Sequence, residues 1–402
     1  MPPHPGLRVD SEIREWLQNK SVIGEDMTIW ALWAIQFAYS KGAKSYDTYN
    51  GIRGELERFI LYLCKEGITP DQVSPLVVSD YMKFCQNPDE EWVMRYKAHR
   101  FDVYGLPNLE WRPFYLPVED KKVLSDLNRI KPAKKPKIIK KGFSQASLKR
   151  RFSFLRQWYD DLLFEGRVDR NPVERAIRNS ELIFRSTDEK QPNTFTKDEW
   201  FLIANHLLDA ANEDPKWERT FFVILLMKSC YLRLSDLCRR PYHDPLMSHF
   251  YQFKGYWFLR VISKGKKERS VTVPNALLEY LVRYRETRGL EGLPTPNEHE
   301  PLIAKDKGHG GVGTRQMSRI IKDGFSEVAR RIRPDDEDTA NKVEDAVTHI
   351  LRHTGASIDA FWRPIPELAE ELGHDDPATT GRLYVHSLRE ERAKRGSGRA
   401  LF

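Results

Sequence analysis

The chain has 402 residues, a length at which two domains are more common than one hydrophobic core. Apolar residues make up 40% and charged residues 31% of the sequence, which is typical of a soluble globular protein and excludes a disordered one. The net charge of +7 favours an acidic partner only weakly, and no apolar run reaches the length of about eighteen residues that a membrane span needs. The four cysteines lack metal-ligand spacing and the first residues lack a signal core, so we expect free thiols in the cytoplasm.

The first part of the chain is predicted to be helical. A short polar extension, 1–26, precedes an apolar and aromatic stretch that predicts a helix from Thr28 onward. A longer helix is predicted to follow and to end at Gly67. Its apolar positions at helical spacing are Ile52, Leu56, Phe59, Ile60 and Leu63. A third helix is predicted at 79–86, which completes a small helical unit.

Residues 87–142 interrupt this helical pattern. They are rich in proline and in aromatic residues, which can form a local mini-core or stack on nucleic-acid bases; we favour the mini-core. From Arg129 to Arg151 the chain carries ten cationic residues and no acidic one. Such a run is often a solvated linker, but this one leads directly into a helix, which favours nucleic-acid binding.

The helix that follows is predicted to begin at Ser144 and to end at Gly166. Its apolar stripe consists of Leu148, Phe152, Leu155, Tyr159 and Leu162. Cations lie largely off this stripe, an arrangement that suits docking along a phosphate backbone. The predicted DNA-contacting cations are Lys140, Lys141, Lys149, Arg150, Arg151 and Arg156.

A polar stretch at 186–195 is the predicted linker to a second domain. Thr196 and Glu199 after it form a capping-box pattern, and the apolar run 220–230 predicts a core helix. The clear β signal is a hairpin, with strands at 257–262 and 269–273 around a turn rich in Lys and Gly. Helices are predicted again at 275–289, near 314–331 and in the block 348–387.

Several residues of this second part suit the cutting of a phosphodiester. Without a metal, such a reaction needs a nucleophile, cations on the non-bridging oxygens and an acid for the leaving oxygen. Arginine binds phosphate oxygens in pairs, lysine on a turn can reach a leaving oxygen, and histidine moves protons near neutral pH. The candidates are Arg233 and Arg352 as clamps, Lys264 as acid, His349 and His374 as proton-transfer or orienting groups, and Tyr384 as nucleophile.

Each of these residues also has a structural explanation when it is taken alone. Arg233 could make a salt bridge at a helix end, Lys264 could be an exposed turn lysine, and Tyr384 could be half-buried in a core. A zinc site is a further alternative, because His349 and His353 lie four residues apart. However, Ile350 stands where zincins carry Glu, and no third ligand is evident.

Taken together, the motifs resemble those of the tyrosine recombinase, or phage integrase, family. The family order is an arginine box, a lysine hairpin, His-x-x-Arg, Leu-Gly-His and Tyr-x-His. In this chain the corresponding segments are CYLRLSDL, VISKGKKERSVTVP, HILRHTGAS, ELGH and LYVHS. One of these motifs alone is weak, but five in order over about 150 residues are highly specific. Two departures are Tyr231 in place of the usual Gly and Ile350 in place of the usual Asp.

The resemblance implies a fold that is mainly α with a small antiparallel β-sheet in the catalytic domain. It implies a helical core-binding domain at 27–185, with an insertion at about 87–142, and a mixed α+β catalytic domain at 196–387. Residues 388–402 resemble the C-terminal tails that dock on a neighbouring protomer.

The resemblance also implies a role for each site residue. Arg233 and Arg352 would clamp the phosphate, Lys264 would protonate the 5′-hydroxyl, and His349 would take part in proton transfer. His374 would support the scissile phosphate. Tyr384 would form a 3′-phosphotyrosyl bond.

The implied activity is site-specific recombination of double-stranded DNA, with a dimer on each site, a tetramer in the synapse and no metal or nucleotide cofactor. The chain length and the insertion favour a recombinase of a mobile genetic element. The sequence does not show whether accessory proteins take part. Two alternatives remain: a DNA-binding regulator that has lost catalysis, and a type IB topoisomerase-like nicking and closing enzyme.

Overall fold

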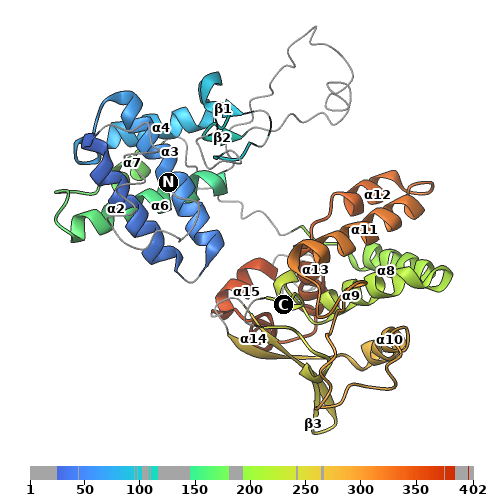
Figure 1. Ribbon diagram of the computed structural model, residues 1–402. Coiled ribbons are helices and arrows are strands. Elements are labelled where there is room, and N and C mark those ends of the chain that lie inside the picture. Colours follow the sequence, from blue (N-terminus) through green and yellow to red (C-terminus); the bar gives the residue numbers. More distant parts are fainter. Residues whose placement is uncertain are drawn as a thin grey trace, which may run out of the picture. The chain divides into compact units, whose positions relative to one another are not determined.

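The computed structural model describes two compact units of the chain, Met1–Thr187 and Asp188–Phe402 (Figure 1). The residues it describes are 25–43, 45–94, 96, 98–101, 108, 110–115, 145–180, 193–240, 243–263, 267–374, 376–384 and 397. For 25, 26, 145 and 382–384 it describes the backbone alone. No described helix is both long and apolar enough to cross a membrane.

The N-terminal unit is built from helices, as predicted. Its elements are α2 Glu25–Gly42, α3 Tyr46–Glu66, η1 Pro70–Gln72, α4 Pro75–Gln86, η2 Glu90–Trp92, β1 Val93–Met94, β2 Phe114–Tyr115, α6 Gln145–Phe164 and α7 Pro172–Arg178. Ser45 caps α3 by accepting a hydrogen bond from the Thr48 amide, and α3 ends at Gly67, whose φ of 69° is a conformation that glycine adopts readily. Ser144, the predicted cap of α6, lies outside the described residues.

The core of this unit forms where α2 and α6 pack against α3. The predicted apolar stripe of α6 is confirmed, because Leu148, Phe152, Leu155, Tyr159 and Leu162 are all buried. Phe59 of α3 lies edge-to-face with Tyr159 at 6.3 Å between ring centroids. Burying a large apolar side chain stabilises a fold by about 1.5–3 kcal/mol, so this stripe fixes α6 in the unit.

Segment 87–115 adds a small two-stranded parallel sheet to the same unit. Val93 pairs with Phe114, and Met94 pairs with Tyr115. Phe114 is buried, and Phe84 of α4 lies edge-to-face with both Phe114 and Trp92. These contacts confirm the mini-core interpretation for Trp92 and Phe114, whereas Tyr115 stays exposed.

The C-terminal unit is mainly helical with one small antiparallel sheet, which confirms the predicted fold class. Its elements are α8 Lys197–Glu213, η3 Pro215–Trp217, α9 Glu218–Ser229, η4 Leu234–Asp236, η5 Met247–His249, β3 Phe250–Phe253, β4 Tyr256–Ile262, β5 Glu268–Thr272, α10 Asn275–Glu286, α11 Thr314–Ile332, α12 Glu337–Glu344, α13 His349–Asp359, α14 Ile365–Leu372 and α15 Pro377–Tyr384. The sheet order is β3-β4-β5, and both pairings are antiparallel.

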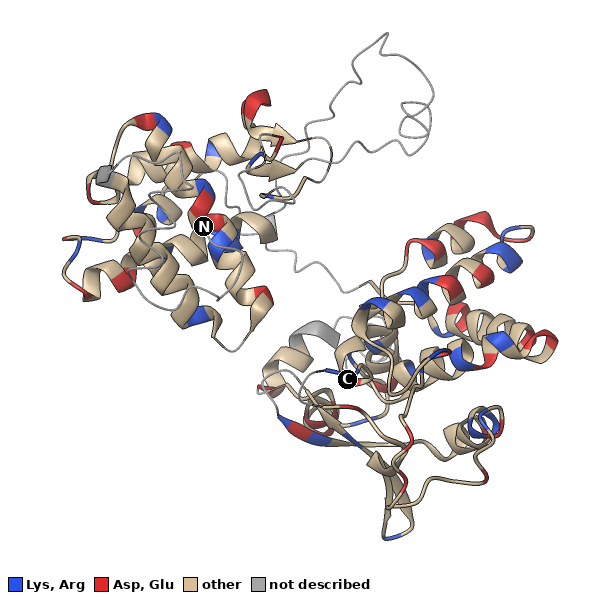
Figure 2. Cartoon of the chain, in the orientation of Figure 1, with Lys and Arg blue, Asp and Glu red and all other residues tan. Residues whose placement is uncertain are grey.

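Helix α9 is the buried centre of this unit, and α8, α10, α11 and α13 pack around it. The predicted capping box of α8 is present: Thr196 Oγ1 accepts from the Glu199 amide at 3.1 Å, and Glu199 Oε2 accepts from the Thr196 amide at 2.7 Å. Figure 2 shows both signs of charge on α11 and α12, so these helices do not form a uniformly basic face.

Candidate active site

Arg352 is the most deeply buried cation of the candidate site. It lies on α13 and is only 3% exposed. Its guanidinium donates to the backbone carbonyl of Tyr231 at 2.6 Å and to that of Leu372. A buried charge is costly unless it is hydrogen-bonded, so these carbonyls both stabilise Arg352 and fix the direction of its guanidinium.

Arg352 can reach Tyr231 because α13 approaches α9 without a side chain between them. A Cβ atom added to Gly355 would lie 2.1 Å from the backbone oxygen of Lys228, at the end of α9. Glycine is therefore the residue that permits this contact, which gives a physical reason for the Gly of the HTGAS segment.

Tyr231 adopts the backbone conformation that its usual family counterpart, glycine, adopts readily. Its φ is 49°, in the left-handed region, which costs free energy for a residue with a side chain. The ring is buried, its hydroxyl donates to Asp359 of α13, and Arg363 donates to the same hydroxyl at 3.3 Å. These contacts offset the strain and leave the Tyr231 carbonyl directed at Arg352.

His374 lies directly after α14 and contacts the same arginine. Its Nε2 is 3.4 Å from Nη2 of Arg352, and its Nδ1 is 2.7 Å from Oγ1 of Thr380 on α15. Because a guanidinium can only donate, Nε2 accepts and Nδ1 carries the proton, which it donates to Thr380. Burial, with the positive charges of Arg352 and Arg233, lowers the pKa of His374 to about 4, so the ring is neutral at pH 7.

Arg233 joins this group at the start of η4. It is partly exposed, forms no ion pair with a described carboxylate, and is close enough to His374 to lower the pKa of that ring. Its position is set through its backbone, because Asp236 Oδ2 accepts from the Arg233 amide at 3.0 Å. The structure therefore brings Arg233, Arg352 and His374 together.

Asp236 also connects Arg233 with the hairpin β4–β5. This carboxylate is 1% exposed and accepts from Arg269 of β5 at 3.1 Å and from the hydroxyl of Ser263 at 3.3 Å. Arg269 donates in turn to the backbone oxygen of Glu371 on α14, at 2.8 Å. The arginine box, the hairpin and α14 thus share one buried polar network.

The other three candidate residues are not seen to join this group. Lys264 follows Ser263 in the hairpin turn but lies outside the described residues. His349 is exposed at the first position of α13. Tyr384 is the last residue of α15, and its side chain is outside the described part.

The histidine pair considered as a zinc face does not belong to a larger ligand group. Among the described residues there is no cluster of three or more His, Cys, Asp or Glu side chains that could hold a metal ion. Burial and the charge of Arg352 lower the pKa of His353 to about 4.

Sequence comparison shows which proteins the C-terminal unit is similar to. Residues 201–391 match the family model described as the phage integrase family. The C-terminal unit is therefore similar to the phage integrase family over most of its length. Among curated proteins, it is 27% identical to the tyrosine recombinase XerC of Vibrio vulnificus over 252 residues, which is 62% of this chain and 68% of that protein. It is 29% identical to the tyrosine recombinase XerC of Thermodesulfovibrio yellowstonii over 257 residues, 62% of this chain and 73% of that protein.

Solved structures of integrase-family proteins share the fold. The post-cleavage complex of the XerH site-specific recombinase with palindromic difH substrate has a TM-score of 0.55 at 14% identity, over 97% of this chain and 94% of that one. The Tn1549 transposon integrase in complex with transposon right end DNA has a TM-score of 0.53 at 12% identity, over 91% of this chain and 99% of that one.

The cations predicted to contact DNA differ in their surroundings. Lys149, Arg150 and Arg156 are exposed on α6, and the Arg150 guanidinium lies 5.2 Å from the centre of the Phe154 ring. Arg151 is 9% exposed and pairs with the buried carboxylate of Glu55 on α3. Lys140 and Lys141 lie outside the described residues. Arg151 therefore has a structural partner that the other three cations of α6 do not share.

Sequence reasoning missed the residues that position the site. Asp236, Ser263, Arg269 and Thr380 were not among the candidates, although each contacts a candidate or its neighbour. The available signal was the Asp three residues after Arg233, a spacing at which a side chain can accept from the earlier backbone amide.

Proposed function

We propose that this chain is a site-specific DNA recombinase that cuts and rejoins DNA strands through a 3′-phosphotyrosyl intermediate on Tyr384. The observation that carries the proposal is the convergence of two arginines, Arg233 and Arg352, on the neutral ring of His374 in a unit similar to the phage integrase family. The two guanidinium groups suit the monoanionic phosphate of a phosphodiester, because a guanidinium can donate to two phosphate oxygens at once.

In the proposed cleavage step, the phenolic oxygen of Tyr384 attacks the scissile phosphorus. A bond from the tyrosine oxygen to phosphorus forms, and the bond from phosphorus to the 5′-oxygen of the next nucleotide breaks. Lys264 donates a proton to that leaving oxygen, and His349 receives the proton of Tyr384. One phosphate ester replaces another, so the reverse attack by a 5′-hydroxyl rejoins the strand without an external source of energy.

The buried arginine has the features that charge stabilisation requires. Negative charge builds on the non-bridging oxygens as the phosphorus is attacked, and preorganised donors stabilise it without having to reorient. Arg352 is held by two backbone carbonyls before any phosphate binds. His374, held by Thr380 and in contact with Arg352, would support the phosphate by keeping the Arg352 guanidinium in place.

The proposal includes double-stranded DNA as the partner, with the exposed cations of α6 on its phosphates. It includes two protomers on each site and four in the synapse. It also includes a mobile genetic element as the source of the DNA, on the basis of the segment 87–142. Salt dependence tests the contact between the α6 cations and DNA phosphates. Each phosphate contact contributes about 0.9 to the magnitude of the slope of log affinity against log salt concentration. Lys149→Ala should therefore reduce the magnitude of that slope by about 0.9.

A nicked suicide substrate tests the chemistry. The recognition site is first selected from a random duplex library by its binding to Tyr384→Phe, which keeps the phosphate clamp. Wild-type protein incubated with a nicked form of that site should give a covalent, protease-sensitive adduct on a denaturing gel, and Tyr384→Phe should give none. Binding without an adduct in the wild type would favour the DNA-binding regulator, and relaxation of any supercoiled plasmid would favour the topoisomerase-like enzyme.

A further inference from the structure

The hydroxyl of Thr380 connects helix α15, which ends at Tyr384, to the candidate active site. Thr380 lies in the middle of α15 and is 0% exposed. Its Oγ1 is 2.7 Å from Nδ1 of His374, a residue of the short connection between α14 and α15. A buried hydroxyl without a hydrogen-bond partner is costly, so this contact fixes Thr380 and the imidazole relative to each other.

The same imidazole contacts the arginine proposed to bind the phosphate. Nε2 of His374 is 3.4 Å from Nη2 of Arg352, and that Nη2 also donates to the backbone carbonyl of Leu372. The backbone of the connection is held as well, because the His374 amide donates to the Ala369 carbonyl of α14 at 3.0 Å. A continuous series of contacts therefore leads from Arg352 through His374 to α15.

Helical geometry extends this series to Tyr384. Tyr384 lies four residues after Thr380 on α15, which is about one turn, so the two positions share one face of the helix. The hydrogen bond at Thr380 resists both a rotation of α15 about its axis and a shift along it. Either movement would carry the Tyr384 backbone with it. The position of Tyr384 relative to Arg352 is therefore coupled to the hydroxyl of Thr380.

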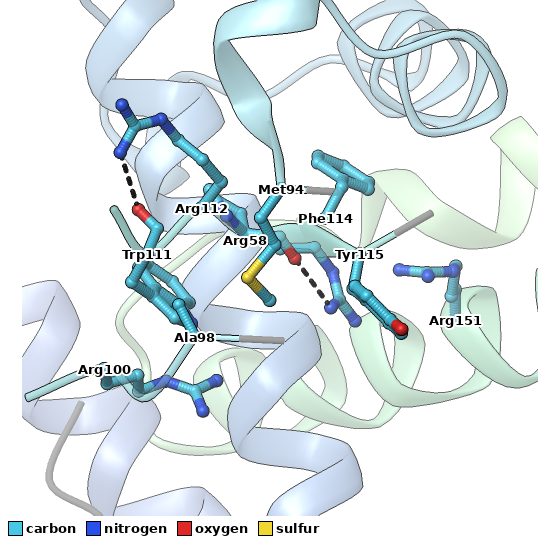
Figure 3. Close-up of a pocket in the computed structure, with 10 residues that line it drawn as sticks. Arg58, Met94, Ala98, Arg100, Trp111, Arg112, Phe114, Tyr115 and Arg151 are labelled. Atoms are coloured by element: carbon cyan, nitrogen blue, oxygen red, sulfur yellow. Dashed lines mark hydrogen bonds between the residues drawn. The ribbon is translucent and has the colours of Figure 1, made fainter. Parts of the chain in front are cut away.

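Arginines of the N-terminal unit show a different way of fixing a guanidinium. Arg58, Arg100 and Arg151 line one cavity of that unit (Figure 3). Arg58 and Arg151 pair with the carboxylate of Glu55, and Arg100 pairs with that of Glu57. A carboxylate partner offsets the positive charge that it holds in place, which leaves less charge for an anionic ligand.

His374 and Thr380 provide orientation without adding negative charge. Burial, with the positive charges of Arg352 and Arg233, lowers the pKa of His374 to about 4, so the ring is neutral at pH 7. The hydroxyl of threonine is also uncharged. Neither group therefore offsets the positive charge of the two arginines, which suits a site that binds a phosphate.

We propose that Thr380 is a positioning residue for strand cleavage, which sets the place of Tyr384 relative to the phosphate held by Arg233 and Arg352. The proposal rests on the proposed recombinase function and adds a residue to it. Thr380 acts through His374 and α15 and not by touching the reacting atoms. Because a displacement of about 1 Å can slow a reaction about 100-fold, the hydroxyl contributes to the rate of cleavage and not to DNA affinity.

The test measures DNA affinity and the rate of adduct formation separately, with the full-length chain at saturating concentration on the nicked suicide substrate. Thr380→Val replaces the hydroxyl with a methyl group, Thr380→Ala removes it without adding one, and Thr380→Ser keeps it. Thr379→Val is the matched control, because it makes the same change one residue earlier on α15, at a partly exposed position. Amide hydrogen exchange, followed by mass spectrometry, reports on α15 independently of the chemistry and confirms that each variant is folded.

Thr380→Val and Thr380→Ala should form adduct at least about ten-fold more slowly than the wild type, with DNA affinity within about two-fold of it. Thr380→Ser should restore most of the rate, and Thr379→Val should match the wild type. Amide exchange in α15 should become about five-fold faster in Thr380→Val, the change expected from one lost hydrogen bond, and should stay unchanged in Thr379→Val.

The proposal is overturned if Thr380→Val and Thr380→Ala cleave at the wild-type rate while Tyr384→Phe gives no adduct. It is also overturned if Thr380→Ser is as slow as Thr380→Val, because packing and not the hydroxyl then matters. A different pattern would remove the proposed function itself: either the wild type forms no adduct, or Tyr384→Phe forms one at the wild-type rate. The positioning role of Thr380 would fall with it.

Discussion

The contact between α13 and α9 predicts that Gly355→Ala damages both the stability of the C-terminal unit and its phosphate clamp. The added Cβ would lie 2.1 Å from the Lys228 oxygen and 3.1 Å from Cδ1 of Tyr231. Restoring an ordinary contact of 3.4 Å to that oxygen requires the helices to separate by about 1.3 Å. A shift of that size would break the 2.6 Å hydrogen bond from Arg352 to the Tyr231 carbonyl.

Two costs combine in this variant. Overpacking typically costs about 1–3 kcal/mol, and a lost hydrogen bond from a charged group costs about 1.5–3 kcal/mol. We therefore expect the free energy of unfolding of the C-terminal unit to fall by about 2.5–6 kcal/mol, measured by urea unfolding. The yield of covalent adduct should fall as well, because Arg352 loses its fixed direction.

Gly54→Ala is the matched control for this substitution. Gly54 also lies inside a helix, α3, but a Cβ added there meets nothing within 4 Å. This change should stabilise the N-terminal unit by about 0.5–1 kcal/mol, because alanine loses less backbone entropy on folding. If Gly355→Ala left both stability and adduct yield at wild-type values, the close helix approach could not be what positions Arg352.

Two further predictions concern buried charges of the same unit. Asp236→Ala removes the acceptor shared by Arg269, Ser263 and the Arg233 amide. It should lower the free energy of unfolding, measured in urea, by about 3–5 kcal/mol, and Asp236→Asn should lie closer to wild type. An alanine variant as stable as the wild type would contradict a structural role for this network. The pKa of His374 is lowered to about 4 from an unfolded value near 6.5, so the unfolded state binds more protons between these values. Stability from this ring is complete above about pH 6.5 and is lost as the pH falls toward 4, by about 2 kcal/mol at pH 5. His374→Gln should flatten that part of the stability profile, and an unchanged profile would refute the assignment.

The features that sequence predicted well are those set by local spacing. The stripe from Leu148 to Leu162, the end of α3 at Gly67 and the capping box at Thr196 each depend on residues within a few helical turns. Strand β3 and helix α12 were not predicted, because four residues and eight mostly polar residues carry little periodic signal.

The features that sequence missed depend on partners far along the chain. Arg269 reaches Asp236 across 33 residues, and Arg151 reaches Glu55 across 96. The prediction that Arg151 lies off the apolar stripe of α6 was wrong, because the helical period places it at the edge of that stripe and the structure buries it. The period alone cannot reveal that a buried carboxylate on α3 is its partner. The left-handed backbone of Tyr231 could not be predicted either. The hydrogen bond that offsets its strain goes to Asp359, which lies 128 residues away in the sequence.

The most direct test of the phosphotyrosyl proposal is to locate the covalent bond. The adduct with the suicide substrate is digested with nuclease and trypsin and is mapped by mass spectrometry. Trypsin cuts after Arg382 and Arg389, so the proposal predicts a nucleotide mass on the peptide 383–389, LYVHSLR, with fragment ions placing it on Tyr384. A nucleotide on any other peptide would contradict Tyr384 as the nucleophile.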